Sequence, residues 1–432
     1  MQFYSLNKRS PKVSFKEATV TGQAPDKGLY FPDVIPQVSK ELIGQIEKRS
    51  NTEIAFEVIK PYVGNTIREE DLYSIAEETV NFPVPLVSIT GKILSLELFH
   101  GPTLAFKDVG ARFMSRCLGY FVKNTEKKIT VLVATSGDTG GAVANGFYKV
   151  DGVDVVILYP SGKVSSVQEK QLTTLGNNVH ALEVNGSFDD CQQMVKQAFS
   201  DEALNKKLVL TSANSINVAR WLPQQFYYFF AYKQWKEKNS PPVISVPSGN
   251  FGNICAGLLA NASGLPVKHF IAACNANNVV TRYLQTENYQ PAKAIATISN
   301  AMDVGDPSNF IRILELFHQQ FHNLKTKVSS YSISDEQTRA TIKKVYADSG
   351  YVADPHGAVA YLALEKYLQT HPAEKGIFLE TAHPVKFYNV IEPLTDDQIE
   401  IPASVQNILG KEKVSSQIEA DFGALQEMLL RL

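Results

Sequence analysis

From about residue 95 onward, short apolar runs rich in β-branched residues alternate with loops of small residues and with segments of helical periodicity. This order is typical of a parallel sheet whose strands are joined by covering helices, so the predicted fold class is α/β. Two units are clear: a run at 129–134 precedes a helical segment at 140–148, and a run at 243–246 precedes one at 253–262. The other expected strands are 155–159, 179–184, 269–274 and 376–380.

The two ends of the chain show a different pattern. The N-terminal part has scattered turns and two or three amphipathic helices, for example at 38–49, and Pro83 and Pro85 mark its join to the body. In the C-terminal tail, apolar residues recur at helical spacing around 417–430, so we expect a helix there that docks on the body. The predicted divisions are an accessory domain at 1–80, a main body at 81–395 and an extension at 396–432.

The composition is that of an ordinary globular protein and excludes several classes of function. Of 432 residues, 44% are hydrophobic and 20% are charged, which argues against a disordered chain. The 42 Lys and Arg residues nearly balance the 44 Asp and Glu residues, for a net charge of −2, and no basic block offers a surface for nucleic acid. No apolar run is long enough to span a bilayer and the first ten residues do not resemble a leader, so we expect a cytoplasmic protein.

The cysteines and histidines predict neither a disulfide framework nor a metal site. The four cysteines, at positions 117, 191, 255 and 274, lie singly in apolar or helical segments, and we expect buried free thiols. His318 and His322 have helical spacing, but the residues between them lack the glutamate of a metalloprotease helix. We therefore interpret this pair as structural and expect no metal.

Three loops carry unusual runs of small residues. They are 135–141 (Thr-Ser-Gly-Asp-Thr-Gly-Gly), 212–217 (Ser-Ala-Asn-Ser-Ile-Asn) and 247–253 (Pro-Ser-Gly-Asn-Phe-Gly-Asn). A parallel sheet binds ligands at the carboxyl ends of its strands, where helix N-termini present free amides to anions. The loops match neither the dinucleotide-binding fingerprint nor the nucleotide-binding P-loop. One glycine-rich turn is as often structural as functional, but together these loops favour an anionic small molecule.

Lys107 follows a turn and an apolar pair, and it precedes a helix that we expect from Val109 onward. One interpretation is a surface lysine near a helix N-terminus, although helix starts disfavour cations. The other interpretation is a functional amine, because apolar neighbours and a positive helix end favour the neutral form, which can attack a carbonyl to form a Schiff base. Position alone leaves both interpretations open.

Four motifs, in this order, resemble those of the threonine synthase family. They are His-Gly-Pro-Thr-Leu-Ala-Phe-Lys-Asp at 100–108, Ala-Thr-Ser-Gly-Asp-Thr-Gly at 134–140, Ser-Gly-Asn-Phe-Gly-Asn at 248–253 and Glu-Thr-Ala-His-Pro at 380–384. The segments 28–36 and 159–165 are also similar, so the resemblance extends from near residue 20 to near residue 385. It implies a two-lobed, tryptophan-synthase-β-like (fold type II) pyridoxal-phosphate enzyme with an added N-terminal domain and a smaller lobe at approximately 100–205.

The resemblance implies a role for each motif. Lys107 would bind pyridoxal phosphate as a Schiff base and then shuttle protons when substrate releases it. Thr381 would place its hydroxyl at the pyridine nitrogen, with a turn-capping threonine as the alternative. The cofactor phosphate would lie in the loop formed by Ser248, Gly249, Asn250, Phe251, Gly252 and Asn253. The α-carboxylate of the substrate would be bound by backbone amides and by the hydroxyls of Thr135, Ser136 and Thr139.

Asp138 departs from the broader fold family, in which asparagine is common at this position, and we assign it to the cofactor site. A carboxylate there would need a proton, a water molecule or a cationic neighbour. The alternative role is to accept amide hydrogen bonds within its own turn.

The substrate that the resemblance implies, O-phospho-L-homoserine, carries a phosphate that must be held and then released. Asn214, Ser215 and Arg220 suit this task, because amide, hydroxyl and guanidinium groups bind phosphate well. The alternatives are capping of the next helix for Asn214 and Ser215, and a solvated helix face for Arg220. Further cationic candidates are Lys163 and, on a different helix face from the cofactor lysine, Arg112.

The implied reaction is a β,γ-elimination and replacement that converts O-phospho-L-homoserine and water to L-threonine and phosphate. The nearest alternative is a serine or threonine dehydratase, or a β-replacement synthase, of the same fold; its substrate has no phosphate to occupy Ser215 and Arg220. A non-catalytic relative that binds a phosphorylated ligand is a second alternative, against which the intact Lys107 and Thr381 argue. We expect an enzyme that acts on a small molecule, as a monomer or homodimer.

Overall fold

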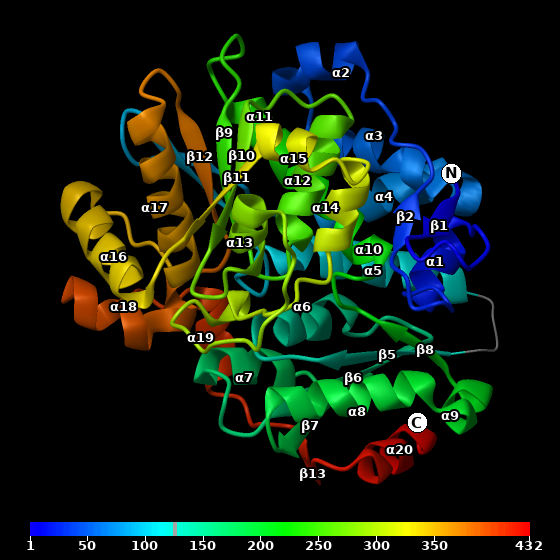
Figure 1. Ribbon diagram of the computed structural model, residues 1–432. Coiled ribbons are helices and arrows are strands. Elements are labelled where there is room, and N and C mark those ends of the chain that lie inside the picture. Colours follow the sequence, from blue (N-terminus) through cyan, green and yellow to red (C-terminus); the bar gives the residue numbers. More distant parts are fainter. Residues whose placement is uncertain (124–127) are drawn as a thin grey trace.

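Two β-sheets, one above the other in Figure 1, organise the chain. The computed structural model describes residues 1–123 and 128–432. We call the part around the upper, six-stranded sheet the large lobe and the part around the lower, five-stranded sheet the small lobe. Helices cover both sheets, and the predicted α/β class is confirmed.

The sheet of the large lobe is parallel except at one edge. Its strands are, in spatial order, β11 (Val328–Ser332), β10 (His269–Cys274), β9 (Val243–Pro247), β12 (Gly376–Glu380), β4 (Ile93–Glu97) and β3 (Leu86–Ser88). Only β3 pairs antiparallel with its neighbour. In the middle of the sheet, Val243 lies opposite both His269 and Gly376. Helix α17 (Pro355–Thr370) packs on one face and α12 (Gly252–Ala262) on the other.

All strands of the small-lobe sheet are parallel. They are, in spatial order, β13 (Ser416–Glu419), β7 (Val179–Asn185), β6 (Val153–Pro160), β5 (Ile129–Ala134) and β8 (Val209–Ser212). Every residue of β5 is buried, because Val131 and Val133 face the large core shared with the rest of the molecule while Leu132 and Ala134 face a separate cluster. Burial on both faces explains why such strands read as continuous apolar runs.

The remaining helices join and cover the two sheets. Those around the small lobe are α6 (Asp138–Phe147), α7 (Ser166–Thr173), α8 (Phe188–Ser200), α9 (Glu202–Lys207), α19 (Ala403–Leu409) and α20 (Phe422–Leu430). Those of the large lobe are α5 (Lys107–Val122), α10 (Val218–Trp221), α11 (Gln225–Gln234), α13 (Val279–Thr286), α14 (Phe310–Leu316), α15 (Phe321–Lys327), α16 (Asp335–Ser349) and α18 (Tyr388–Thr395). Helix α6 lies between the two sheets and packs against α5, which brings the lobes together (Figure 1).

The N-terminal part packs against the large lobe. It contains β1 (Phe3–Ser5), α1 (Phe15–Thr21), β2 (Tyr30–Pro32), α2 (Lys40–Gly44), α3 (Asn51–Val63) and α4 (Glu69–Thr79). The two strands pair antiparallel, and the ring of Phe15 packs at a tilt against that of Phe113 of α5, with 6.3 Å between the ring centres. Because its apolar side chains belong to the same buried cluster as those of α5 and α11, this part shares a core with the large lobe.

Two predicted helices differ from the structure. The segment 38–49 is divided into α2 and a short 3-10 helix, Ile46–Lys48, because α2 ends at Gly44. The segment 417–430 is a strand followed by a helix: Ser416–Glu419 pairs with the edge strand β7, and Asp421 caps α20 by accepting a hydrogen bond from the amide of Ala424 at 3.0 Å. Residues 416–419 form a strand in spite of their helical spacing, because they pair with the exposed edge of β7.

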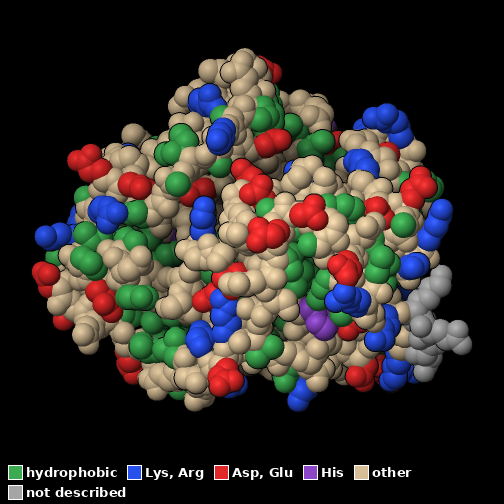
Figure 2. All heavy atoms as spheres, turned by 90° about the horizontal axis from the view of Figure 1, so that it is seen from below, with side chains coloured by type: hydrophobic (Ala, Val, Ile, Leu, Met, Phe, Trp, Pro, Cys, Tyr) green, Lys and Arg blue, Asp and Glu red, His purple; other side chains and the backbone are tan. Residues whose placement is uncertain are grey.

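All six predicted strands are confirmed, with shifts of no more than two residues at their ends. The sequence patterns did not predict β8 and β11, which are short and rich in Ser and Thr, nor the four strands that precede α5. All four cysteines are buried and free, as expected. Within the described residues, each helix is too short or too polar to cross a bilayer. Figure 2, which views the small-lobe side, shows acidic and basic side chains interspersed over this face.

Candidate active site

The position of Lys107 is set by contacts between two segments that are far apart in the sequence. Ala105 forms an isolated antiparallel bridge with Ala382, and the amide of Phe106 donates to the carbonyl of Thr381 at 2.9 Å. The first residue of α5, Lys107, therefore lies beside the end of β12. The sequence motifs at 100–108 and 380–384 meet at this point.

The amine of Lys107 lies in a buried, charged environment. Its side chain is only 19% exposed, so the interpretation as a surface lysine is wrong. Burial lowers the pKa of Lys107, and the positive charges of Lys386 and Arg220 lower this pKa further, while the carboxylate of Asp138 opposes them. The neutral amine needed for attack on a carbonyl is thus favoured.

Asp138, the first residue of α6, has the cationic neighbour that a buried carboxylate needs. Lys386 Nζ lies 2.8 Å from Asp138 Oδ1, and Gln168 Nε2 donates to the same oxygen at 3.0 Å. Lys107 Nζ lies 3.9 Å from Asp138 Oδ2. Burial alone would raise the pKa of Asp138, but the charges of Lys386 and Lys107 hold it below its usual value. These donors come from other segments, so the side chain does more than complete its own turn.

Neither Lys386 nor Gln168 was among the site residues predicted from the sequence. Lys386 lies two residues after the motif at 380–384, in the 3-10 helix Pro384–Phe387, and it is fully buried. The only feature of the sequence that could have indicated a functional role for Lys386 is its position next to that motif. Gln168 had no signal beyond its place in a predicted helical segment.

The loop between β5 and α6 is held in shape by Thr135. The Thr135 hydroxyl oxygen accepts hydrogen bonds from the amides of Gly137, at 3.1 Å, and Gly140, at 2.9 Å. Gly137 has a φ of 149°, and a Cβ there would meet the side chain of Gln168. Thr135 is buried, whereas Ser136 is exposed and Thr139 is half-buried. Of the three predicted hydroxyls, Ser136 and Thr139 are the accessible ones.

The loop between β9 and α12 has the features of a cradle for an anion. A Cβ on Gly249 would lie 2.6 Å from the Cα of Met302, so only glycine fits there. Phe251 has a φ of 61°, which turns the chain into α12 at Gly252. Asn253 is buried, and its Nδ2 has no hydrogen-bond partner among the described residues, while Tyr228 donates to its Oδ1 at 2.8 Å. A free, oriented donor at this helix start fits a phosphate group.

Ser215 is tied to this cradle. Its hydroxyl oxygen accepts hydrogen bonds from Asn250 Nδ2, at 2.9 Å, and from Asn309 Nδ2, at 3.0 Å. Asn250 Oδ1 in turn accepts from the amide of Ser308 at 2.7 Å. Asn214 is half-buried beside Ser215. Neither residue caps the next helix, since Asn217 Oδ1 accepts from the amide of Ala219 at 3.0 Å, and the capping alternative is wrong.

Arg220 is buried, and it packs closely against α5 at Gly110, which has no side chain to keep it away. A Cβ on Gly110 would lie 2.6 Å from the carbonyl oxygen of Arg220 and 3.2 Å from its Nε. Gly110 is three residues after Lys107 and therefore on the same side of α5. In the described part of the chain, Nε and Nη1 of Arg220 have no hydrogen-bond partner. The solvated-face alternative is wrong, because only 4% of Arg220 is exposed.

The other two cationic candidates have different surroundings. Arg112 donates to the carbonyl of Glu78 through Nε at 3.0 Å and to Asn81 Oδ1 at 3.0 Å, so its guanidinium faces the N-terminal part. Lys163 is exposed in the loop after β6, and its charge helps lower the pKa of Asp190. The contacts described here leave both outside the cluster around Lys107.

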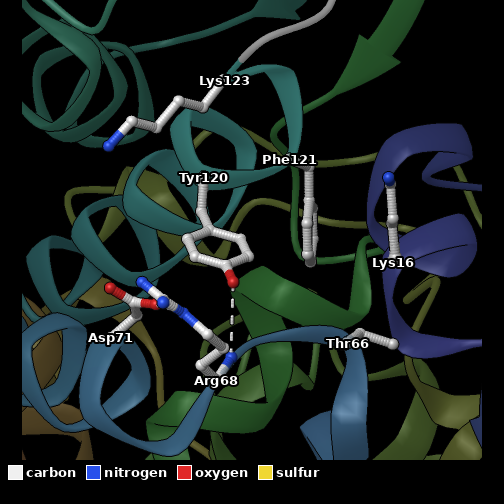
Figure 3. A pocket seen from close by; sticks show the side chains of 7 residues that line it. All are labelled: Lys16, Thr66, Arg68, Asp71, Tyr120, Phe121 and Lys123. Carbon is white, nitrogen blue, oxygen red and sulfur yellow. Dashed lines mark hydrogen bonds and ion pairs between the residues drawn. The ribbon is translucent and has the colours of Figure 1, made fainter.

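Two cavities lie near these elements, one at the C-terminal end of α5 and one beside the segment that holds Lys386. One, of about 410 Å³, lies at the C-terminal end of α5 beside Tyr120 and Phe121 (Figure 3). At 1.5 Å per residue this end is about 21 Å from Lys107, so the cavity is separate from the cluster. The other, of about 670 Å³, is lined in part by His383 and Pro384 and borders the segment that holds Lys386.

Known protein families match the chain over nearly its whole length. Residues 84–379 match the model of pyridoxal-phosphate dependent enzymes. Residues 2–80 match the threonine synthase N terminus, and residues 357–429 match the threonine synthase C-terminal domain.

Individual relatives agree with the family models. Threonine synthase of Escherichia coli (strain K12) is 42% identical over 431 residues, which cover 100% of this chain and 99% of the relative. Threonine synthase of Buchnera aphidicola subsp. Baizongia pistaciae is 44% identical over 432 residues, which cover both chains completely.

Solved structures show the same similarity in three dimensions. The crystal structure of Escherichia coli threonine synthase has a TM-score of 0.92 at 41% identity and covers 100% of both chains. The pyridoxal-phosphate-bound threonine synthase of Brucella melitensis has a TM-score of 0.94 at 32% identity, with coverage of 100% and 99%. The two-lobed fold and the cofactor that the motifs implied are thereby confirmed. The chain belongs to the threonine synthase family and has the pyridoxal-phosphate-dependent lyase activity of that family.

Proposed function

We propose that the chain converts O-phospho-L-homoserine and water to L-threonine and phosphate in threonine biosynthesis, with Lys107 as the residue that binds pyridoxal phosphate. The observation that carries the assignment of residues is the convergence of Lys107, Thr381, Asp138 and Arg220 from four separate segments. The charges of Asp138 and Arg220 act on the amine of Lys107, and Arg220 keeps unused donors.

The residues present fit the cofactor. Asn253 Nδ2 and the amides at the start of α12 would hold its phosphate, and Thr381 would offer its hydroxyl to the ring nitrogen. Ser248, Gly249, Asn250, Phe251 and Gly252 complete the cradle, whose shape Ser215 and Asn309 support. When bound, the cofactor withdraws electrons from the amino acid and makes the protons at its Cα and Cβ acidic.

Lys107 Nζ is the proposed proton carrier. Because its pKa is lowered, the amine can accept the Cα proton. Once it has passed that proton on, it is neutral again and can accept a proton from Cβ, so that the γ-phosphate leaves with the electron pair of its bond to carbon. The ammonium that forms lies 3.9 Å from Asp138 Oδ2, which stabilises its charge.

The two charged ends of the substrate, its α-carboxylate and its phosphate, are assigned to different residues. The α-carboxylate would contact Ser136, Thr139 and the amides at the start of α6, a loop that Thr135 shapes. The phosphate would contact Arg220, with Asn214 and Ser215 nearby. A substrate without phosphate would leave the buried donors of Arg220 unpaired, which favours the phosphorylated substrate over a dehydratase substrate. Lys163 and Arg112 have no part in this assignment.

We also infer that the enzyme is cytoplasmic, is a monomer or homodimer, and has no nucleic acid partner. The near balance of 42 basic and 44 acidic residues supports the last point. Light scattering on the purified protein measures the oligomeric state.

The test is release of phosphate and threonine by the purified protein, with Lys107→Ala beside the wild type. We expect the variant to lose at least about 10³-fold in kcat, because a positioned acid–base group alone contributes 10²–10⁴-fold. Borohydride reduction followed by peptide mapping should attach the cofactor to Lys107 in the wild type only. Lys343→Ala removes an exposed lysine of α16 and serves as the control. If the wild type binds cofactor but releases neither product, the proposed reaction is wrong.

A further inference from the structure

An ion pair inside the molecule crosses from one lobe to the other. Asp138 begins α6 of the small lobe, and Lys386 lies in the 3-10 helix that follows β12 of the large lobe. Their charged atoms are 2.8 Å apart, and the two side chains are 4% and 0% exposed. Gln168 donates to the same carboxylate oxygen at 3.0 Å. Asp138 Oδ1 is therefore fully engaged, and its Oδ2 faces Lys107 Nζ at 3.9 Å.

Stability is a poor explanation for such a pair. Removing two charges from water costs several kcal/mol per ion, and replacement of a buried pair by apolar side chains is often neutral or stabilising. The positive charge of Lys386 acts on other groups besides Asp138, because it helps lower the pKa of the Lys107 amine and the pKa of His383. The pair therefore contributes to the electrostatic field at the Lys107 nitrogen.

Four charged groups, each from a different element, influence the pKa of that nitrogen. They are Asp138 of α6, Lys386 of the 3-10 helix, Arg220 of α10 and Asp354, which caps α17. Among the two acids, Asp138 has the larger effect, and among the two cations, Lys386 has the larger effect. Asp354 is itself bound to His356 Nδ1 at 2.5 Å. Asp138 and Lys386 are thus the two charged groups with the largest effects on the pKa of Lys107, and Asp138 Oδ2 lies 3.9 Å from its nitrogen.

We propose that Asp138 and Lys386 act as a positioning pair that sets the proton affinity of the Lys107 nitrogen: Asp138 Oδ2 attracts the proton to Lys107, and Lys386 limits that attraction. Lys386 also keeps Asp138 ionised, so the proton that Lys107 takes from the substrate remains on Lys107. Without Lys386, the carboxylate would hold Lys107 in its protonated form, which is a poor base. Without Asp138, two buried cations would face each other and the proton would be lost too readily.

This inference rests on the proposed role of Lys107 as the cofactor-binding lysine. It predicts opposite effects for the two members of the pair, whereas a purely structural pair predicts similar effects. An opposite charge within 4–6 Å shifts a pKa by roughly 1–3 units. Lys386→Met should therefore raise the proton affinity of the Lys107 nitrogen, and Asp138→Asn should lower it.

The experiment is a pH titration of the visible absorption of the bound cofactor in the holoenzyme, which reports protonation of the attached Lys107 nitrogen without turnover. We expect the midpoint to rise by about 1 pH unit or more in Lys386→Met and to fall by a similar amount in Asp138→Asn. Lys386→Arg keeps the charge and should stay within a few tenths of a unit of the wild type. The order of midpoints should be Lys386→Met, wild type, Asp138→Asn.

Two further variants keep the test decisive. Asp138→Asn leaves Lys386 buried without a partner and can fail to fold, so the double variant Asp138→Asn/Lys386→Met, which removes both charges, is titrated beside it; its midpoint should lie below that of Lys386→Met. Lys413→Met, which breaks an ion pair with Glu169 and Glu183 on the small lobe far from Lys107 in the sequence, is the matched control and should titrate like the wild type.

Equal midpoints in all variants, or shifts of Lys386→Met and Asp138→Asn in the same direction, overturn the inference. The wild-type midpoint can lie above the accessible pH range. In that case Asp138→Asn or the double variant must lower the midpoint into the accessible range; if neither does, the inference is also overturned. Failure of the proposed function has a different signature, because the cofactor would then not be attached to Lys107 in the wild type.

Discussion

Two buried arginines, Arg312 in α14 and Arg220 in α10, differ in what surrounds their charge. Arg312 is fully buried, and its guanidinium lies 4.3 Å from the ring centre of Trp221. Its nitrogens donate to the carbonyl oxygens of Tyr30, Ser215 and Ile216 and to Asn309 Oδ1, at 2.7–3.2 Å. Arg220 is almost as buried, yet its Nε and Nη1 have no acceptor in the part of the chain that the structure describes.

The comparison shows that burial and charge do not identify a functional arginine. Burial lowers the pKa of Arg220 and of Arg312 to about 10 in each case, so both guanidinium groups are charged at neutral pH. The difference lies in the hydrogen bonds. Because an unpaired buried donor costs free energy, it is retained where a ligand supplies the acceptor. Arg312 joins Tyr30 of the N-terminal part to Ser215 and Asn309, whereas Arg220 is the arginine that we propose for the substrate phosphate.

The largest effect is expected for Arg312→Met. This change leaves three backbone carbonyls and one amide oxygen without a donor, and the free energy of unfolding should fall by about 4 kcal/mol or more. Urea denaturation followed by circular dichroism measures it. Arg339→Met, at an exposed position of α16, should stay within about 0.5 kcal/mol of the wild type. A loss for Arg312→Met as small as that of the control would remove the basis of the comparison.

Arg220→Met should have the second largest effect, on activity and not on stability. We expect kcat/KM for O-phospho-L-homoserine to fall about 10²–10³-fold, since loss of one preorganised donor to a developing charge has this effect. The free energy of unfolding should stay equal or rise, because an unpaired buried charge is removed. Steady-state kinetics and urea denaturation separate the two quantities.

Inorganic phosphate sharpens this prediction. It should raise the melting temperature of the wild type, because a ligand that binds the folded state stabilises it. The increase should be lost in Arg220→Met and kept in Arg112→Met, whose guanidinium contacts Glu78 and Asn81. Equal stabilisation of the wild type and Arg220→Met would show that phosphate binds elsewhere.

The smallest effect is expected for Ser215→Ala, at the residue where the two regions meet. The carbonyl of Ser215 accepts from Arg312, and its hydroxyl oxygen accepts from Asn250 and Asn309. Loss of the hydroxyl leaves two amide donors unpaired and should cost about 1–2 kcal/mol of stability, with less than a tenfold loss of kcat/KM. Ser308→Ala keeps the backbone amide that serves Asn250 and should change neither quantity. A Ser215→Ala variant as inactive as Arg220→Met would instead indicate direct contact with substrate.

Local pattern carried the strand predictions because β5, β9, β10 and β12 are buried on both faces and therefore consist of apolar runs. It failed for β13, a strand of four residues whose pairing with β7 depends on a sheet edge more than 230 residues earlier in the chain. The motifs likewise predicted Lys107 and Thr381 as site residues, because the sequences around them resemble those of the family. They did not identify Asn309, whose role arises only from its contact with Ser215.

By itself, the sequence of this protein determined the α/β class, the central strands, the family and the lysine at the start of α5, because each of these depends on residues that are close together along the chain. The tertiary structure alone decided which charges face one another. Lys386 lies 248 residues from Asp138 along the chain. Arg220 and Arg312 are both arginines on short helices, so the sequence alone does not distinguish their surroundings. Electrostatic and hydrogen-bond energies depend on distances of a few ångströms in space, and only the folded chain establishes those distances.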